Sequence, residues 1–210
     1  MRTRDLDGPI TIINRFTVKE DVETFGREFQ AHSQFLREQQ EFDFLVSMEV
    51  VGAAPVFVQL AHWQTLRGFL QVVHEDAFTR QVQRLGALVE TQADQAVSVA
   101  RSLYADASVG AVNVMLTHAE NPDDWRKFEQ CFGTMSDHFG SLPGFGGSDL
   151  LRSTVRPLNY LGVSWWQDAE SCEQALRGEE YQELRIGMAD LADIATERTR
   201  HVAYQRVLTD

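Results

Sequence analysis

The hydrophobic residues of the chain form two helical stripes that repeat at a fixed distance. From residue 22 to residue 36 the stripe positions recur at alternating steps of three and four, the spacing of one helix face, and the same spacing returns 103 residues later. The stripes are Val22, Phe25, Phe29, His32 and Leu36, and Trp125, Phe128, Phe132, Met135 and Phe139. They predict amphipathic helices near residues 19–40 and 122–140, the second opened by Asn121 as N-cap and Pro122 in its first turn.

A strand that ends in tryptophan also repeats. Val56–Trp63 and Asn159–Trp166 are both followed by glutamine and are again 103 residues apart. Each copy is predicted to be a strand, a long helix, two strands, a short helix, a further helix and a strand. The predicted strands lie near 9–16, 43–51, 55–63 and 95–101, and near 109–117, 146–153, 158–167 and 200–207. The chain is therefore predicted to be two tandem α+β units, residues 8–101 and 109–208.

Each predicted unit has an uncovered sheet face. A four-stranded antiparallel sheet with helices on one side leaves an apolar face that needs a partner. The simplest solution within one molecule is that the two sheets pack face to face and the helices stay outside. We therefore expect two ferredoxin-like units arranged as an intramolecular dimeric α+β barrel.

Composition narrows the classes of partner. The formal charge is −12, with 31 acidic and 19 basic residues, which argues against nucleic acids and anionic membranes. No apolar run approaches the roughly 18 residues of a membrane span. The first residues lack the apolar segment of a signal peptide, and Cys131 and Cys172 have no metal-type spacing. These features predict a cytoplasmic protein with a small-molecule partner and no metal.

Some polar and aromatic residues stand at positions that should be buried. Asn14 alternates with apolar residues along the first strand, and His32 interrupts the first helical stripe. A buried polar group without a partner costs a few kcal/mol, so something must satisfy both. A backbone carbonyl or amide can do so, and Trp63 can be a simple core residue. The coincidence of all three on the helix-covered side favours a pocket.

The sequence resembles the antibiotic biosynthesis monooxygenase family of the dimeric α+β barrel superfamily. The resemblance covers both halves and rests on "ITIINRF" (10–16), "AHWQT" (61–65) and "FLQVVHEDAF" (69–78). It implies a monooxygenase of aromatic polyketide biosynthesis that oxidises a polycyclic phenol or anthrone with dioxygen, without metal or bound flavin. It also implies a pocket between sheet and helices, faced by Asn14 and Trp63. The second copy keeps Trp166 but has Met115 near the Asn position, with Asn113 out of register, so we expect its pocket to be inactive.

The resemblance and the strand alternation together assign roles to eight residues. Asn14 is expected to donate a hydrogen bond to an oxyanion and Trp63 to orient the ring. His32 or His62 is the expected proton acceptor, although His62 alternates to the opposite side of its strand from Trp63. The expected substrate contacts are Phe29, Phe78, His74 and Trp166, although a structural role for His74 at a helix break and for Trp166 in the core is the ordinary alternative.

Three other functions stay open. One is a polyketide ring-cleaving oxygenase that uses reduced flavin supplied in trans. The others are a haem-binding protein and a non-catalytic binding protein. A homodimer of the tandem chain is a further expectation.

Overall fold

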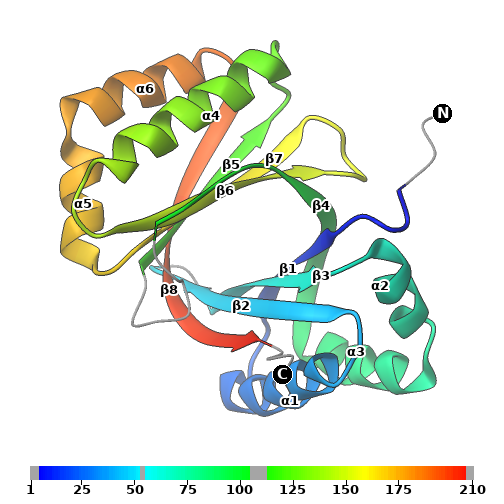
Figure 1. Ribbon diagram of the computed structural model, residues 1–210. Coiled ribbons are helices and arrows are strands. Elements are labelled where there is room, and N and C mark those ends of the chain that lie inside the picture. Colours follow the sequence, from blue (N-terminus) through cyan, green and yellow to red (C-terminus); the bar gives the residue numbers. More distant parts are fainter. Residues whose placement is uncertain (1–4, 53–54, 105–112, 207–210) are drawn as a thin grey trace. The chain divides into compact units, whose positions relative to one another are not determined.

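The computed structural model describes residues 5–52, 55–104 and 113–206 and shows an α+β chain in which one order of elements occurs twice (Figure 1). Each copy contains a strand, a helix, two strands, two helices and a strand, as predicted. The chain divides into two compact units. One comprises the chain up to Gln95 together with the segment from Val202 onward, and the other comprises Ala96–His201. This division falls inside the last strand of each copy, and the expected bounds of 8–101 and 109–208 stay a prediction.

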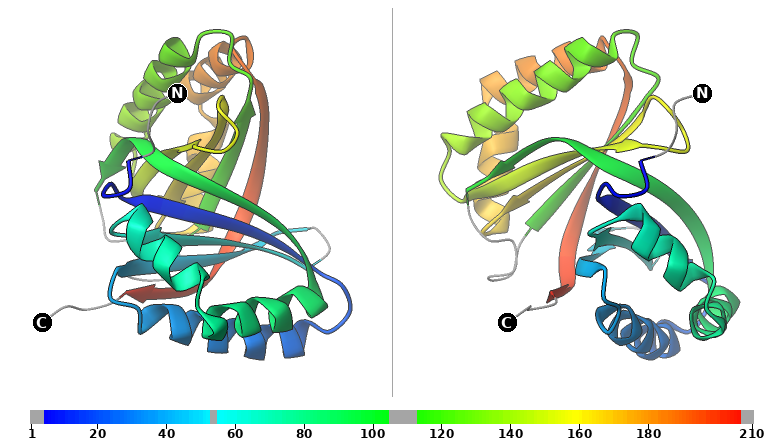
Figure 2. Two further views of the ribbon diagram at one scale, coloured as in Figure 1. Left: turned by 90° about the vertical axis from the view of Figure 1, so that its right-hand side faces the viewer. Right: turned by 45° about the vertical axis from the view of Figure 1, so that its right-hand side comes forward.

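The N-terminal unit is built around the central strand β3. β3 pairs antiparallel with β1 and with β2, and β4 and β8 flank these three strands. Figure 2 shows helices α1 and α3 side by side on one face of the sheet. The elements are β1 (Ile10–Val18), α1 (Val22–Arg37), β2 (Phe42–Val50), β3 (Val56–Trp63), α2 (Leu66–Val73), α3 (Asp76–Leu88) and the beginning of β4 (Val89–Leu103).

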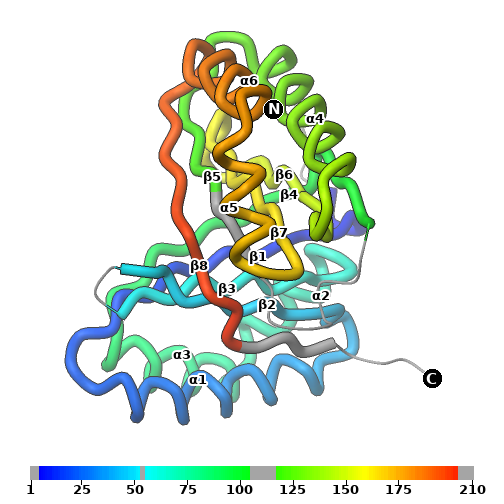
Figure 3. Tube along the Cα trace, turned by 90° about the vertical axis from the view of Figure 1, so that its left-hand side faces the viewer, coloured from blue at the N-terminus to red at the C-terminus, as the bar shows by residue number. Residues whose placement is uncertain are grey.

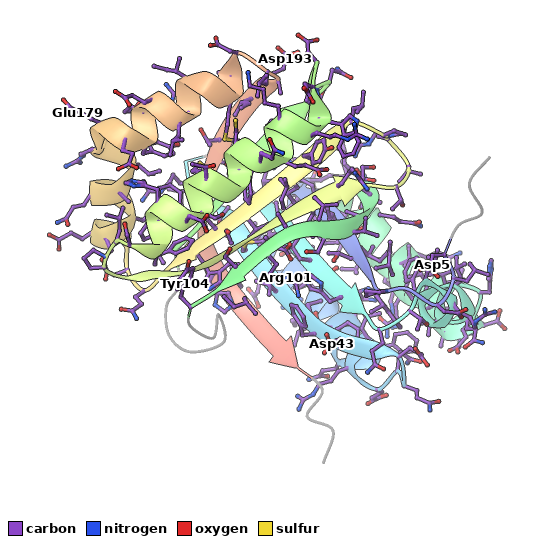
Figure 4. The ribbon with its side chains drawn as sticks, turned by 45° about the horizontal axis from the view of Figure 1, so that its top comes forward. Asp5, Asp43, Arg101, Tyr104, Glu179 and Asp193 are labelled. Carbon is purple, nitrogen blue, oxygen red and sulfur yellow. The ribbon has the colours of Figure 1, made fainter. Side chains whose placement is uncertain are left out.

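The C-terminal unit repeats this arrangement around β7. β7 pairs antiparallel with β5 and β6, the second half of β4 pairs with β6, and the first part of β8 pairs with β5. Helices α4 and α6 lie side by side (Figure 3), and Figure 4 labels Glu179 and Asp193 at the starts of α6 and β8. The elements are β5 (Asn113–Glu120), α4 (Trp125–Gly140), β6 (Phe145–Ser153), β7 (Asn159–Trp166), α5 (Ala169–Arg177), α6 (Glu179–Ala189) and β8 (Asp193–Arg206).

A buried carboxylate holds the second half of β4 in the C-terminal sheet. Asp149 of β6 accepts hydrogen bonds from Ser98 and from Arg101, which is labelled in Figure 4. The Arg101 Nε to Asp149 Oδ2 distance is 2.8 Å. Burial raises the pKa of Asp149, and the Arg101 guanidinium opposes that rise. A buried charge with matched partners fixes the register of the two strands.

Strand register confirms the internal repeat. Ile10 lies opposite Trp63, and Asn113 lies opposite Trp166, so equivalent pairs are 103 residues apart in structure as well as in sequence. The face-to-face packing of the two sheets stays a prediction.

The start of helix α4 differs from its prediction. The N-cap is Asp124, whose side chain accepts hydrogen bonds from the backbone N–H groups of Arg126 and Lys127. Asn121 adopts a φ of 49° and, with Pro122, precedes the helix, so the prediction of an Asn121 cap was wrong. Across the described ranges, no helix combines the length and the apolarity that spanning a membrane requires.

Candidate active site

Three polar side chains cross one face of the N-terminal sheet in a single row. Asn14 of β1 lies opposite Gln59 of β3, which in turn lies opposite Ser47 of β2. Opposed residues on neighbouring antiparallel strands project to the same side of the sheet. That side faces α1, because Phe57, which shares the face with Gln59, lies against Phe25 of α1 with ring centroids 5.0 Å apart. The sheet therefore presents two amides and a hydroxyl to its helix layer.

This row contains hydrogen-bonding atoms without partners. Gln59 is 0% exposed and Ser47 is 1% exposed. Asn14 donates from Nδ2 to Gln59 Oε1 over 3.2 Å, which occupies the oxygen of Gln59. Gln59 Nε2 and Ser47 Oγ have no hydrogen-bond partner in the part of the chain that the structure describes. An N–H and an O–H group are therefore available to a ligand oxygen, and burying them unpaired costs free energy.

His32 adds a titratable group from the helix side. Its side chain is 5% exposed, its ring centroid is 5.7 Å from that of Phe78 on α3, and its Nδ1 has no partner within residues 5–52, 55–104 and 113–206. Burial lowers the pKa of His32 from 6.5 to about 4. The imidazole is therefore neutral near pH 7, the state in which it can accept a proton.

Phenylalanine rings lie on the same helix-covered side of the sheet as these polar groups. Phe29 of α1 stacks on Phe25 at 5.4 Å and meets Phe16 of β1 edge-on at 5.8 Å. Phe78 contacts His32 and lies 6.5 Å from Phe35. Phe29 and Phe78 are both only partly buried, so they lie at the margin of the aromatic layer rather than at its centre. Such a surrounding suits a flat aromatic molecule.

Trp63 lies on the same face as Gln59, four residues along β3. It is 2% exposed and meets Phe42 and Phe69 edge-on, with centroids 5.4 and 5.5 Å away. These contacts give it a packing role whatever else it does. Its predicted role in orienting a substrate stays a prediction.

Three predicted site residues lie away from this group. His62 is on the other face of β3, where its Nδ1 is 2.8 Å from Thr11 Oγ1 and its ring stacks on Phe44 at 3.9 Å. His74 is exposed and forms the C-cap of α2. Trp166 is fully buried in the C-terminal core, against Phe139 and Phe145. Of the two predicted proton acceptors, only His32 lies on the helix-covered side with Asn14.

The C-terminal unit fills the equivalent positions with mostly apolar residues. Its register sets Thr117 opposite Gly162 and Gly162 opposite Leu150, where the N-terminal unit has Asn14, Gln59 and Ser47. The counterpart of Asn14 is therefore Thr117 and not the predicted Met115, and the 103-residue offset of the repeat gives the same position. A Cβ atom on Gly162 would lie 2.6 Å from the Phe132 ring, so this ring occupies the space that the Gln59 side chain would need. Met135 replaces His32.

The C-terminal unit has its own small polar group, nearer to its tryptophan. Ser148 lies opposite Ser164 and exchanges a hydrogen bond with Ser136 of α4. Ser164 Oγ and Trp166 Nε1 are buried without a partner among the described residues. Met135 stands in this unit at the position that His32 holds in the N-terminal unit.

Gln59 and Ser47 were not predicted as site residues. Gln59 interrupts an apolar strand, "VFVQLAHW", on the face that also carries Trp63, and this was a usable signal. The strand register was needed to show that Asn14 occupies one end of the Gln59 amide and that Ser47 lies beside it.

No protein-family model and no curated protein sequence matches this chain. Solved structures do match it in fold. A candidate monooxygenase from Fusobacterium nucleatum subsp. nucleatum is 10% identical with a TM-score of 0.79, covering 95% of this chain and 94% of that chain. An anthrone oxidase-like protein is 11% identical with a TM-score of 0.77, covering 96% and 94%.

A third solved structure with a similar fold is related to the antibiotic biosynthesis monooxygenases. It is a ferredoxin-fold protein related to antibiotic biosynthesis monooxygenases, from Listeria monocytogenes, 11% identical with a TM-score of 0.58 over 94% of this chain and 97% of that chain. At these identities the likeness shows the fold. The chain thus has a tandem ferredoxin-like fold, which it shares with a protein related to antibiotic biosynthesis monooxygenases.

Proposed function

We propose that this protein is a monooxygenase that oxidises a polycyclic phenol or anthrone with dioxygen in its N-terminal unit, without metal or bound flavin. The observation that carries the proposal is the set of unpaired buried atoms Gln59 Nε2, Ser47 Oγ and His32 Nδ1. The C-terminal unit shows that the same fold is completed with apolar residues at these positions. A polar group that the fold does not need is best explained by a ligand that uses it.

The reaction is one that such groups can assist. An anthrone loses a proton to form an anion delocalised over its rings, and this anion can pass an electron to dioxygen. The two radicals combine into a peroxide at the same carbon, and loss of the second C–H proton with cleavage of the O–O bond gives the ketone and water. One oxygen atom enters the substrate and the other leaves as water, so no external reductant is required.

Each polar residue has a role in the first step. Gln59 Nε2 and Ser47 Oγ stabilise the oxyanion of the substrate by hydrogen bonds, and Asn14 holds the Gln59 amide in the orientation that leaves Nε2 free. His32 Nδ1 takes the proton. Burial causes its low pKa of about 4, and an anion beside the imidazole raises that pKa and favours the transfer.

Oxygen consumption on anthrone and on 1-naphthol, with metal-stripped and flavin-free protein, tests this function. Gln59→Leu keeps much of the side-chain volume and removes the donor. We expect its kcat to fall by about 100-fold, the loss typical for one oxyanion donor. For Asn14→Ala we expect a smaller fall in kcat, about 10-fold, because this change only releases the Gln59 amide from its fixed orientation.

The control is Ser164→Ala, which removes a buried hydroxyl from the C-terminal unit and should leave oxygen consumption unchanged. Equal rates for wild type, Gln59→Leu and Asn14→Ala would refute the site. Turnover only with added reduced flavin would favour the ring-cleaving alternative. Ligand binding or a haem Soret band without oxygen consumption would favour a binding protein. The polyketide substrate, the cytoplasmic location and the homodimer of the tandem chain stay predictions.

A further inference from the structure

A second amide, that of Gln81 on α3, has a buried atom without a partner. Gln81 Oε1 is inaccessible and accepts no hydrogen bond from any described residue. Gln81 follows Phe78 by three positions and precedes Leu85 by four, so the three side chains lie on one face of the helix. This face points toward α1 and the sheet, because Phe78 contacts His32 and Leu85 belongs to a buried cluster with Phe16 and Phe25. Gln81 therefore lies on the helix side of the site, between the level of His32 and that of Phe25.

The fold does not require an amide at this position. The C-terminal counterpart, 103 residues later, is Leu184 on α6, which packs against the hydrophobic core of its unit. Leucine also favours the helix at least as well as glutamine does. Like Gln59 and Ser47, Gln81 is therefore a polar residue whose counterpart in the C-terminal unit is not polar.

The unpaired atom of Gln81 is a hydrogen-bond acceptor, whereas that of Gln59 is a donor. Gln59 and Ser47 present N–H and O–H donors from the sheet, whereas Gln81 presents a carbonyl oxygen from the helix layer. A carbonyl oxygen can only accept a hydrogen bond. A ligand that satisfies both must carry an acceptor oxygen on its sheet-facing edge and a donor hydroxyl on its helix-facing edge.

We propose that Gln81 is a specificity-determining residue that selects hydroxylated polycyclic substrates by accepting a hydrogen bond from a ring hydroxyl. The inference rests on the proposed function. The substrate class is then a polycyclic phenol or anthrone with a free hydroxyl outside the reacting ring. A substrate without that hydroxyl leaves Gln81 Oε1 buried and unpaired, and sites built to bond a hydroxyl reject the analogue that lacks it.

The test compares anthrone with 2-hydroxyanthrone and 3-hydroxyanthrone, whose hydroxyls are too far from the ring carbonyl to bond to it. For wild type, we expect kcat/KM for at least one hydroxylated substrate to exceed that for anthrone by at least about 10-fold. In Gln81→Leu this preference should fall to about one, because kcat/KM for the hydroxylated substrate loses the contribution of that hydrogen bond. Gln83→Leu makes the same change at an exposed position of the same helix and should keep the wild-type preference.

The outcomes separate this inference from the function on which it rests. If Gln81→Leu lowers the rates on all three substrates equally, or if the preference is absent in wild type or survives in Gln81→Leu, Gln81 does not select substrate and the oxygenase proposal stands. If no anthrone is oxidised, the Kd values of wild type and Gln81→Leu for anthraquinone and its 2-hydroxy derivative test whether Gln81 selects hydroxylated ligands. If wild type binds the 2-hydroxy derivative more tightly and Gln81→Leu does not, the role of Gln81 is supported although the oxygenase proposal fails. If wild type binds neither compound, both proposals are overturned.

Discussion

Replacing Gly147 with alanine should lower the free energy of unfolding by about 3 kcal/mol. Gly147 is in β6, where it lies opposite Leu103 of β4 and Trp165 of β7, and its φ is +151°. A Cβ atom there would lie 2.5 Å from the backbone carbonyl oxygen of Ser102 and would clash with the Trp165 ring. The Ser102 oxygen is part of the backbone, so relief requires β4 to move away from β6. Both the strained backbone and the clash act against the folded state.

Urea unfolding of Gly147→Ala and wild type measures the loss. Gly133→Ala is the matched control, because Gly133 is in helix α4 and a Cβ atom on it would meet nothing within 4 Å. That control should gain up to about 1 kcal/mol, the helix preference of alanine over glycine. An unfolding midpoint for Gly147→Ala at or above the wild-type value would show that β4 and β6 are not packed as closely as described.

Replacing His32 with methionine, the residue of the C-terminal unit, should change how stability depends on pH. The pKa of His32 is lowered to about 4 in the folded protein, against 6.5 for the free side chain. Between these values the unfolded chain binds a proton that the folded chain does not, so His32 makes stability fall as the pH falls from 6.5 to 4. The full effect corresponds to about 3 kcal/mol at and below pH 4 and vanishes above pH 6.5.

The measurement is the difference in unfolding free energy between His32→Met and wild type at pH 7 and at pH 4.5. The unfolding free energy of the variant minus that of wild type should be about 2–3 kcal/mol more positive at pH 4.5 than at pH 7. Other groups that titrate in this range cancel because both proteins carry them. A pH-independent difference for His32→Met would mean that the imidazole is hydrated or paired in the folded state.

The sequence predicts the repeat and the helix faces well because both depend on local spacing. The stripe from Phe25 to Leu36 is the buried face of α1, and the tryptophans that end β3 and β7 hold equivalent positions. The early parts of β4 and β8 were missed. Their first residues, "VETQAD" and "DIATER", are mostly polar and are exposed or partly buried except for Val89, so no alternation marks a strand there.

The site is harder to predict because it depends on contacts between strands. Asn14, which is partly buried, and His32, which is buried, were recognisable as polar residues at positions on the helix-covered side. The availability of the Gln59 donor follows from its pairing with Asn14, and that pairing exists only once β1 and β3 are in register. The same register identifies Thr117, rather than Met115, as the counterpart of Asn14. Local patterns identify which side chains are buried, whereas their partners are set by the sheet.

Strands β4 and β8 are each divided between the two compact units, so the two copies belong to one continuous chain. This has a consequence for how the sequences of the two copies can diverge. In a dimer of identical single-copy chains, one gene encodes both sites, so any substitution in one pocket appears in the other. Duplication within one chain removes this coupling, and selection acts on each copy separately. Selection on the C-terminal copy need only maintain the strands that exchange hydrogen bonds with β4 and β8. Its interior is then free to carry Gly162, Leu150 and Leu184 where the N-terminal copy carries Gln59, Ser47 and Gln81.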